Sequence, residues 1–186
     1  SSYAQAAAMA MGRAMDDVVI SAALGTAFTG ETGSTSTANA NQIVHGSAGL
    51  TIAKLRTAKQ TLDLGDVDPS IPRHIIVSPK QITDLLGTTE VTSSDFNTVK
   101  ALANGEINSF LGFNFIVSNR LAKSSTTRSC IAYAQDGIAL AVGKDVNARI
   151  DERSDKSYAT QVYYCMSIGA TRMEEAKVVE VQCTES

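Results

Sequence analysis

The chain of 186 residues is long enough for one domain or two small lobes around a hydrophobic core. Hydrophobic residues make up 44% of it and charged residues 19%, which excludes a disordered segment. Its formal net charge of −3 argues against a dedicated nucleic-acid binder, and no apolar run reaches the roughly 20 residues of a membrane-spanning helix.

The first segment predicts a long helix over residues 4–24, because one apolar stripe runs along it at helical spacing. The stripe consists of Met11, Met15, Val18 and Ala22. On this helix Arg13, Asp16 and Asp17 are i, i+3 and i+4 neighbours, so the guanidinium can reach either carboxylate or be offered to a partner. A helix of about 33 Å at the very start of the sequence also suggests that an upstream portion is missing.

Residues 26–49 are rich in Gly, Ser, Thr and Asn and predict an exposed loop. A second helix is expected over residues 50–62. Its buried side consists of Ile52, Leu55 and Leu62. Residues 65–72 are a turn-rich connector, and the nearly all-apolar residues 73–77 predict a strand in the middle of a sheet.

A third helix is predicted to begin with a capping box, in which Ser78 is the N-cap, Pro79 the first helical residue and Gln81 the reciprocal partner. Its buried side consists of Ile82, Leu85 and Leu86. Gly87 ends this helix, and a further short helix is expected over residues 95–103.

The most informative stretch, residues 104–121, predicts a strand, a pivot at Gly112, a second strand and a turn. After the pivot the side chains alternate at the two-residue period of a half-buried strand. The side predicted to be buried consists of Phe113, Phe115 and Val117, and the opposite side of Asn114, Ile116 and Ser118. We therefore expect Gly112 and the three buried side chains to be structural.

The C-terminal part is predicted to be mainly β-structure. Residues 127–133 indicate a strand, whereas residues 137–142 suit either a buried helix or a strand, because periodicity does not distinguish the two for a short apolar run. Three alternating runs define later strand faces: Val146, Ala148 and Ile150; Tyr158, Thr160, Val162, Tyr164, Met166 and Ile168; and Val179, Val181 and Cys183.

A search for reactive groups finds no catalytic constellation, and no catalytic residue, metal site or cofactor is predicted. His45 lies in the low-complexity loop, and His74 begins an apolar strand. Residues 137–145 miss the pattern of a phosphate-binding loop, since they are too apolar and lack a Ser or Thr after the lysine. The three cysteines, Cys130, Cys165 and Cys183, form no CxxC pair, and we expect buried free thiols in a reducing cytoplasm.

Charges of both signs gather near the C-terminus. One group consists of Arg149, Asp151, Glu152, Arg153, Asp155 and Lys156, and the next of Arg172, Glu174, Glu175 and Lys177. They suit a solvated hairpin with local ion pairs of about 0–1 kcal/mol each. They equally suit salt bridges between subunits, where mixed charges set orientation and register.

Several segments, in this order along the chain, resemble those of tailed-bacteriophage major capsid proteins. They are residues 12–30 (long spine helix and loop), 73–79 (central strand and proline), 112–121 (glycine-introduced strand and Ser-Asn-x-Leu turn), and 151–153 and 169–179 (closing strands). The resemblance implies the α+β Hong Kong 97-like capsid fold, with a spine helix, a peripheral (P) domain and a central (A) domain. The N-terminal arm and E-loop of that family are not visible in this sequence.

The resemblance also implies a domain layout: spine helix and loop of the P domain over residues 1–47, mainly A domain over 48–145, and closing strands that return to the P domain over 146–186. The implied function is that of a non-enzymatic subunit of an icosahedral virion, assembled in the bacterial host cytoplasm. Its implied partners are copies of itself in hexamers and pentamers, with scaffold and portal proteins. Double-stranded DNA would be enclosed without sequence-specific binding, and no membrane is involved.

The candidate inter-subunit contacts are Arg13, Asp16, Asp17, Arg149, Arg153, Arg172 and Glu174. The same residues could instead fix the P domain internally. Two other classes of function stay open, namely an encapsulin-like or gene-transfer-particle shell, and a small hydrolase or secreted binding module.

Overall fold

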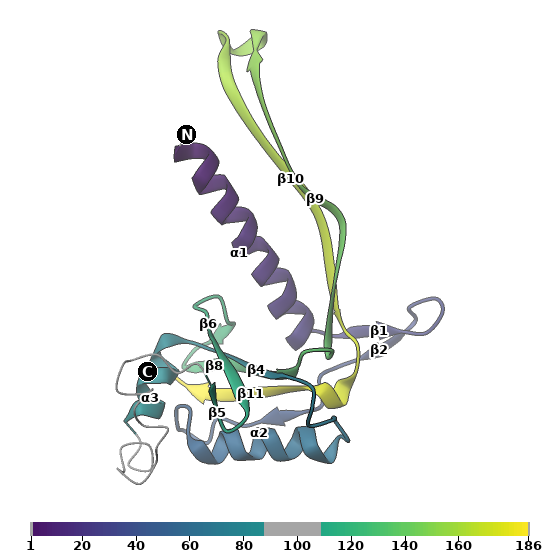
Figure 1. Cartoon of the computed structure of the whole chain (residues 1–186), viewed down its shortest axis with the longest axis vertical. Helices are drawn as coiled ribbons and strands as arrows, with labels where there is room; N and C mark the ends of the chain where they lie inside the picture. Colours follow the sequence, from purple (N-terminus) through teal and green to yellow (C-terminus); the bar gives the residue numbers. More distant parts are fainter. Residues whose placement is uncertain (1, 88–108, 186) are drawn as a thin grey trace.

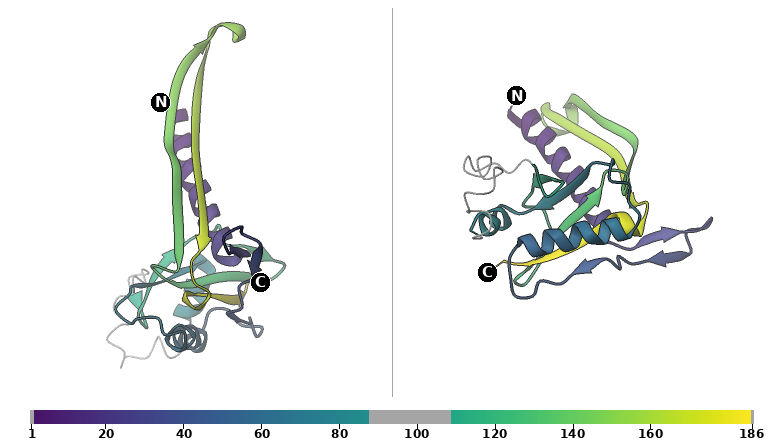
Figure 2. Two further views of the ribbon diagram at one scale, coloured as in Figure 1. Left: turned by 90° about the vertical axis from the view of Figure 1, so that its right-hand side faces the viewer. Right: turned by 60° about the horizontal axis from the view of Figure 1, so that its bottom comes forward.

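The computed structural model describes residues 2–87 and 109–185, which form a base and a long arm that projects from it (Figure 1). The arm consists of α1 (Ser2–Leu24) and a hairpin of β9 (Ile138–Arg153) and β10 (Ala159–Arg172). Figure 2 shows from another direction that α1 lies alongside this hairpin. The long helix predicted at the start of the chain is therefore confirmed.

The base contains a seven-stranded sheet in the order β3-β11-β8-β4-β6-β5, with β7 paired to β8. The strands are β3 (Gln42–Ile43), β4 (Arg73–Val77), β5 (Ser109–Phe110), β6 (Phe113–Val117), β7 (Lys123–Ser124), β8 (Thr127–Ala134) and β11 (Val178–Thr184). β4 is parallel to β6 and β11 to β3, and the other pairs are antiparallel. Together with α2 (Ile52–Leu64) and α3 (Pro79–Leu86), this mixed sheet is of the predicted α+β class.

Strand β4 lies in the middle of the sheet, as its apolar sequence predicts. Ile75 and Val77 are fully buried, while Ile76, on the opposite side of the strand, lines a narrow cleft with Ile20 of α1. Figure 1 shows α2 along one side of the sheet and the lower end of α1 reaching the other. A strand covered on both sides needs apolar side chains at successive positions.

The second predicted helix is confirmed as α2, with a slightly later start. Leu55 and Leu62 are fully buried and Ile52 is half-buried. The Thr51 side chain accepts a hydrogen bond from the backbone N–H of Lys54 at 3.3 Å, which caps the helix.

The capping box predicted for α3 is wrong. Ser78 is the N-cap and Pro79 opens the helix, but the Ser78 side chain makes no capping hydrogen bond. Gln81 is fully buried, and its side-chain oxygen accepts a hydrogen bond from the backbone N–H of Leu50 at 2.8 Å. This tertiary partner replaces the local one, so the sequence motif marks the helix start but not the role of its side chains.

The Gly-, Ser- and Thr-rich stretch after α1 is mostly exposed, as predicted, but it is not wholly irregular. It contains β3 and a small hairpin of β1 (Ala27–Thr29) and β2 (Thr35–Thr37), which projects from the base (Figure 1). Strands of two or three residues are too short to leave a hydrophobic period in the sequence.

The pivot at Gly112 is a two-residue turn that joins β5 and β6. Leu111 and Gly112 have φ angles of 52° and 83°, and Phe110 pairs with Phe113 across the turn. Positive φ at both central positions is the requirement of a type I′ hairpin turn, and the second position is the one where glycine is preferred.

The predicted burial of the β6 face is only partly right. Phe113 is fully buried and Phe115 is half-buried against the core, but Val117 is 56% exposed, so its predicted burial is wrong. The reason is that β5 pairs only with the first two residues of β6, which leaves the far end of β6 at the edge of the described sheet.

In the arm, the expected β10 face is confirmed along most of its length. Val162, Tyr164, Met166 and Ile168 are half-buried while Tyr163 is 50% exposed, the alternation of a strand with one covered side. Tyr158 precedes the first residue of β10, and Thr160, which lies in the strand, is exposed near the tip. Residues 137–142, undecided between helix and strand, begin β9.

The short helix expected over residues 95–103 lies outside the described residues. The third predicted segment, residues 146–186, is divided in the structure: β10 belongs to the arm, whereas β11 pairs with β8 and β3 in the base.

Candidate interaction surface

The arm has one apolar side that α1 covers incompletely. Because β9 and β10 pair antiparallel, Leu140, Val142 and Ile150 of β9 face the same way as their partners Ala170, Ile168 and Val162 of β10. These β10 side chains are half-buried, but the three β9 side chains are 45%, 51% and 63% exposed. We call Leu140, Val142 and Ile150 the β9 apolar strip.

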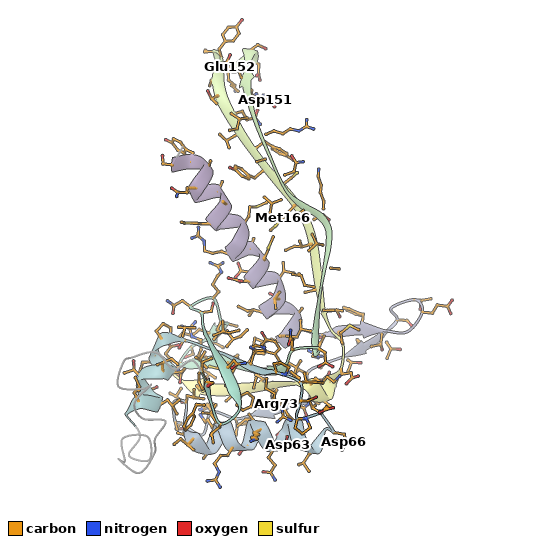
Figure 3. All side chains as sticks on the ribbon, in the orientation of Figure 1. Asp63, Asp66, Arg73, Asp151, Glu152 and Met166 are labelled. Carbon is orange, nitrogen blue, oxygen red and sulfur yellow. The ribbon has the colours of Figure 1, made fainter. Side chains whose placement is uncertain are left out.

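The tip of the arm extends past the end of α1. The Tyr164 hydroxyl donates a hydrogen bond to the carbonyl of Ala4, in the first turn of the helix, at 3.3 Å. Sixteen residues of β9 span about 50 Å, whereas 23 helical residues span about 35 Å. In Figure 3, Asp151 and Glu152 lie at the tip and Met166 lies lower, beside α1.

A change of strand register bends the hairpin in its middle. The pairing shifts between Cys165 and Ser167 and again between Ser167 and Ile168. Such bulges bend a strand and increase its twist, and the hairpin is visibly curved there (Figure 1).

The opposite side of the hairpin is polar and holds several of the predicted charges. A shallow hollow of about 380 Å³ is lined by Lys144, Asn147, Arg149, Asp151, Gln161, Tyr163 and Cys165. Arg149 is exposed and makes no hydrogen bond or ion pair within the described ranges. At the tip, Nε of Arg153 donates to a carboxylate oxygen of Asp155 at 2.8 Å, and this bond lowers the pKa of Asp155.

Near the base, the charges of α1 do not pair as the helix spacing allows. Asp17 forms a two-pronged ion pair with Arg120, which lies in the turn after β6, and this bond lowers the pKa of Asp17. Arg13 and Asp16 are exposed, and neither forms an ion pair or hydrogen bond in the part of the chain that the structure describes.

The two remaining predicted charges differ in environment. Arg172 is 5% exposed, and its guanidinium is bonded to groups of this same chain at the foot of the arm. Glu174 is exposed and forms an ion pair with Lys177 at 3.0 Å. Of the two roles expected for these charges, the geometry of Arg172 favours the internal one.

The histidines and cysteines considered in the sequence analysis occupy structural positions. The imidazole of His45 accepts the backbone N–H of Ser47 at 3.0 Å, and His74 stacks on Tyr133 with ring centres 5.5 Å apart. All three cysteines are free, with Cys130 and Cys183 buried as predicted and Cys165 only half-buried. Over the described residues, no group of three His, Cys, Asp or Glu side chains could hold a metal ion.

One groove on the base carries several carboxylates. It measures about 680 Å³, and Asp63, Asp66 and Arg73 lie along it (Figure 3). Arg73 is buried and bonded to Asp63 at 2.7 Å and to the carbonyl of Val67 at 3.1 Å. This arrangement neutralises the carboxylate of Asp63 and anchors the connector between α2 and β4.

Sequence reasoning missed two cations that organise the fold. Arg120 binds Asp17 across 103 residues of sequence. Lys54 is buried, and its ammonium donates to the carbonyls of His45, Ala48, Gly49 and Gln182 at 2.7–3.0 Å. A lysine without a nearby carboxylate in sequence gives no local signal of such a role.

No membrane-spanning candidate emerges from the described helices, α1 included.

The chain matches the family model described as phage capsid protein over residues 1–185. No curated protein sequence matches it.

Solved structures share its fold at low sequence identity. A structure from Mycobacterium phage Che8 has a TM-score of 0.75 at 17% identity and covers 96% of this chain. The capsid of an empty GTA particle has a TM-score of 0.70 at 14% identity over 98% of this chain. The capsid of the cyanophage P-SCSP1u has a TM-score of 0.65 at 16% identity, again over 98%. This chain spans 61%, 65% and 66% of those chains respectively.

Proposed function

Since this chain belongs to the phage capsid protein family, we propose that it is a structural subunit of an icosahedral virion shell that encloses double-stranded DNA. The observation that carries the proposal is the family match over residues 1–185, and the family is one of structural proteins rather than enzymes. The subunit would associate with copies of itself into hexamers and pentamers. Scaffold and portal proteins are further expected partners.

The geometry of the arm supports self-association as the mode of action. A two-stranded ribbon with free edges and exposed apolar side chains is poorly stable in water unless something covers it. The β9 apolar strip lies open beside α1, and large contacts between subunits are how such surfaces become buried in an assembly. We assign the β9 apolar strip to contact with a neighbouring copy.

The exposed charges of the arm fit a role in orientation. Arg13, Asp16 and Arg149 make no ion pair in the described part of the chain, and Arg153 and Glu174 use only local partners. Charges that are left free on one subunit are available to opposite charges on the next, where they set register and suppress wrong pairings.

The two-part shape supports a division into domains. The arm would be the peripheral domain, with α1 as its spine helix, and the base would be the central domain. On this division β11 belongs to the central domain, because it lies inside the sheet of the base.

A shell built for another cargo is the second candidate, and the similarity to the capsid of a GTA particle favours it. An encapsulin-like compartment falls in the same class. Purified particles distinguish a virion from a compartment, since a virion holds DNA protected from nuclease, whereas a compartment holds protein cargo.

The proposal is tested by placing a charge on the β9 apolar strip. Ile150→Asp puts a carboxylate where the neighbouring copy should bury an apolar side chain, so we expect particle yield, measured by electron microscopy and sedimentation, to fall strongly. Leu64→Asp is the matched control, because Leu64 is 77% exposed on α2, away from the arm. Both variants should keep the unfolding free energy of the isolated subunit within about 0.5 kcal/mol of the original. Normal particle yield from Ile150→Asp would remove this strip from the proposed interface.

A further inference from the structure

The connections between arm and base meet at one buried side chain. The chain leaves the arm after α1 at Gly25, re-enters it after Gly137, and leaves it again at Arg172. Arg172 pairs with Ile138 at the foot of the hairpin, and the next residue, Met173, donates its backbone N–H to the carbonyl of Gly137 at 2.9 Å. All three crossings therefore lie around Arg172.

The guanidinium of Arg172 bonds to the end of α1, to β2 and to the segment that follows β10. Its Nη1 donates to the carbonyls of Ala23 at 3.0 Å and Gly25 at 2.7 Å, and its Nη2 to the carbonyl of Thr37 at 3.0 Å. Its Nε donates to the carboxylate of Glu175 at 3.0 Å. We call Arg172 with these four partners the Arg172 clamp.

The chemistry of the clamp suits arginine in particular. The last carbonyls of a helix have no partner within it, and they carry the negative end of the helix dipole. The planar fork of arginine can donate to several acceptors at once in a fixed geometry, which the single ammonium of lysine cannot reproduce. The Arg172 clamp therefore fixes the end of α1 relative to β2 and to the foot of β10.

The surroundings of the clamp leave little room for alternative packing. A Cβ atom added to Gly137 would lie 2.9 Å from Cβ and 3.0 Å from the carbonyl oxygen of Lys177. The carboxylate of Glu175 makes a second contact, because it accepts a hydrogen bond from the backbone N–H of Ala40 at 2.7 Å. The foot of the arm is thus a close-packed junction rather than a flexible linker.

A second anchor lies farther up the helix. The ion pair of Asp17 with Arg120 attaches α1 to the turn after β6, two turns before the clamped end. Two attachments along a rod define its direction, whereas one defines only its position.

From this arrangement we infer that Arg172 is a positioning residue that sets the angle between arm and base, and through it the geometry of the assembled shell. The second half of this inference rests on the proposed function, because an angle matters to a shell only if the arm contacts neighbours. The first half concerns the isolated subunit.

The angle is measurable in the unassembled full chain. Dye pairs on Lys144→Cys in β9 and Arg56→Cys in α2, in a Cys165→Ser background, report the distance between arm and base by single-molecule energy transfer. Arg172→Lys keeps the charge but loses the fork, so we expect a broader distance distribution than in the original protein. Arg149→Lys is the matched control, an exposed arginine outside the clamp, and should leave the distribution unchanged. An unchanged distribution in folded Arg172→Lys overturns the positioning role.

If Arg172→Lys does not fold, Glu175→Gln tests the positioning role instead. This substitution removes the negative charge that faces the Arg172 guanidinium and keeps an oxygen acceptor. Broadening of the distance distribution in that variant supports the clamp, and an unchanged distribution overturns it.

The link to shell geometry is tested separately by particle diameter. Mixed diameters from a variant with broadened distances support the link to shell geometry, and uniform particles overturn it. Failure of the original full-length protein to form particles would defeat the proposed function, while the distance measurement would still decide the role of Arg172.

Discussion

Phe113 is the largest of the fully buried side chains in the described residues, and it follows directly on the tight turn at Gly112. The turn brings β5 back onto β6 and so closes the base at this point. Val117, only two pleats farther along the same strand, is mostly exposed. Burial therefore changes from complete to slight within one strand of five residues.

This gradient gives a prediction with an internal control. Phe113→Ala removes a fully buried ring and should cost about 3–5 kcal/mol of unfolding free energy in denaturant titration. Phe115→Ala should cost less, because that ring is only half-buried. Val117→Ala should change stability by no more than about 0.5 kcal/mol. A loss for Val117→Ala as large as that for Phe113→Ala would mean that the end of β6 is covered after all.

At the scale of the element, α1 is a helix whose attachment depends on polar anchors more than on burial. Only Ile20 and Ala23 of the described helix are buried. Its polar attachments include the Arg172 clamp, the ion pair of Asp17 with Arg120 and the hydrogen bond from Tyr164 to the carbonyl of Ala4. The stripe predicted from helical spacing is half-buried along its length.

The ion pair makes the attachment of α1 dependent on pH. The hydrogen bond from Arg120 holds the pKa of Asp17 below its ordinary value of 3.8. The stabilisation is therefore complete above that ordinary value and is lost as the pH falls through the lower folded value. We expect hydrogen exchange of α1 amides, relative to those of β8, to rise as the pH falls through this range in the original protein.

Asp17→Asn should show the raised exchange of α1 amides, relative to those of β8, already at neutral pH. This variant should show no further acid-dependent rise from the Asp17–Arg120 pair. Asp16→Asn is the matched control, since Asp16 neighbours it on the helix without forming an ion pair in the described structure. The same acid dependence in original and Asp17→Asn proteins would show that other carboxylates, such as Glu185 beside Arg128, control it.

The whole molecule is an elongated subunit with little of its arm buried. Its charges of both signs are spread over α1, the hairpin tip and the foot of the arm, and several have no partner within the described chain. Such a distribution stabilises a monomer little, because exposed ion pairs contribute about 0–1 kcal/mol each. It can nevertheless determine how two copies meet.

Charge reversal tests whether these charges determine how two copies meet, with particle assembly as the measurement. Arg13→Glu changes an exposed, unpaired charge on α1, so we expect lower particle yield and a steeper dependence of yield on salt, with an unchanged melting temperature of the subunit. Arg153→Glu should act in the same direction at the arm tip. Normal assembly of both variants at low and high salt would mean that these charges form only a solvated surface.

Local signals in the sequence were enough to predict most of the longer elements in the described residues. Helical spacing, the Ser78–Pro79 helix start, the glycine at the turn before β6 and the two-residue period of β10 each depend on neighbours within a few residues, and the order of these segments carried the family resemblance. Those signals are local because backbone hydrogen bonding and side-chain periodicity are local.

The partners of individual side chains were determined only in three dimensions. Gln81 bonds to Leu50, Asp17 to Arg120 and Lys54 to the carbonyl of Gln182, all across stretches of chain that no spacing rule connects. Arg172 was recognised as a charge near a turn, but its burial depends on three chain crossings that meet around it. A side chain's partner and exposure depend on which distant segments the fold brings together. The local spacing of residues in a single sequence does not indicate which segments these are.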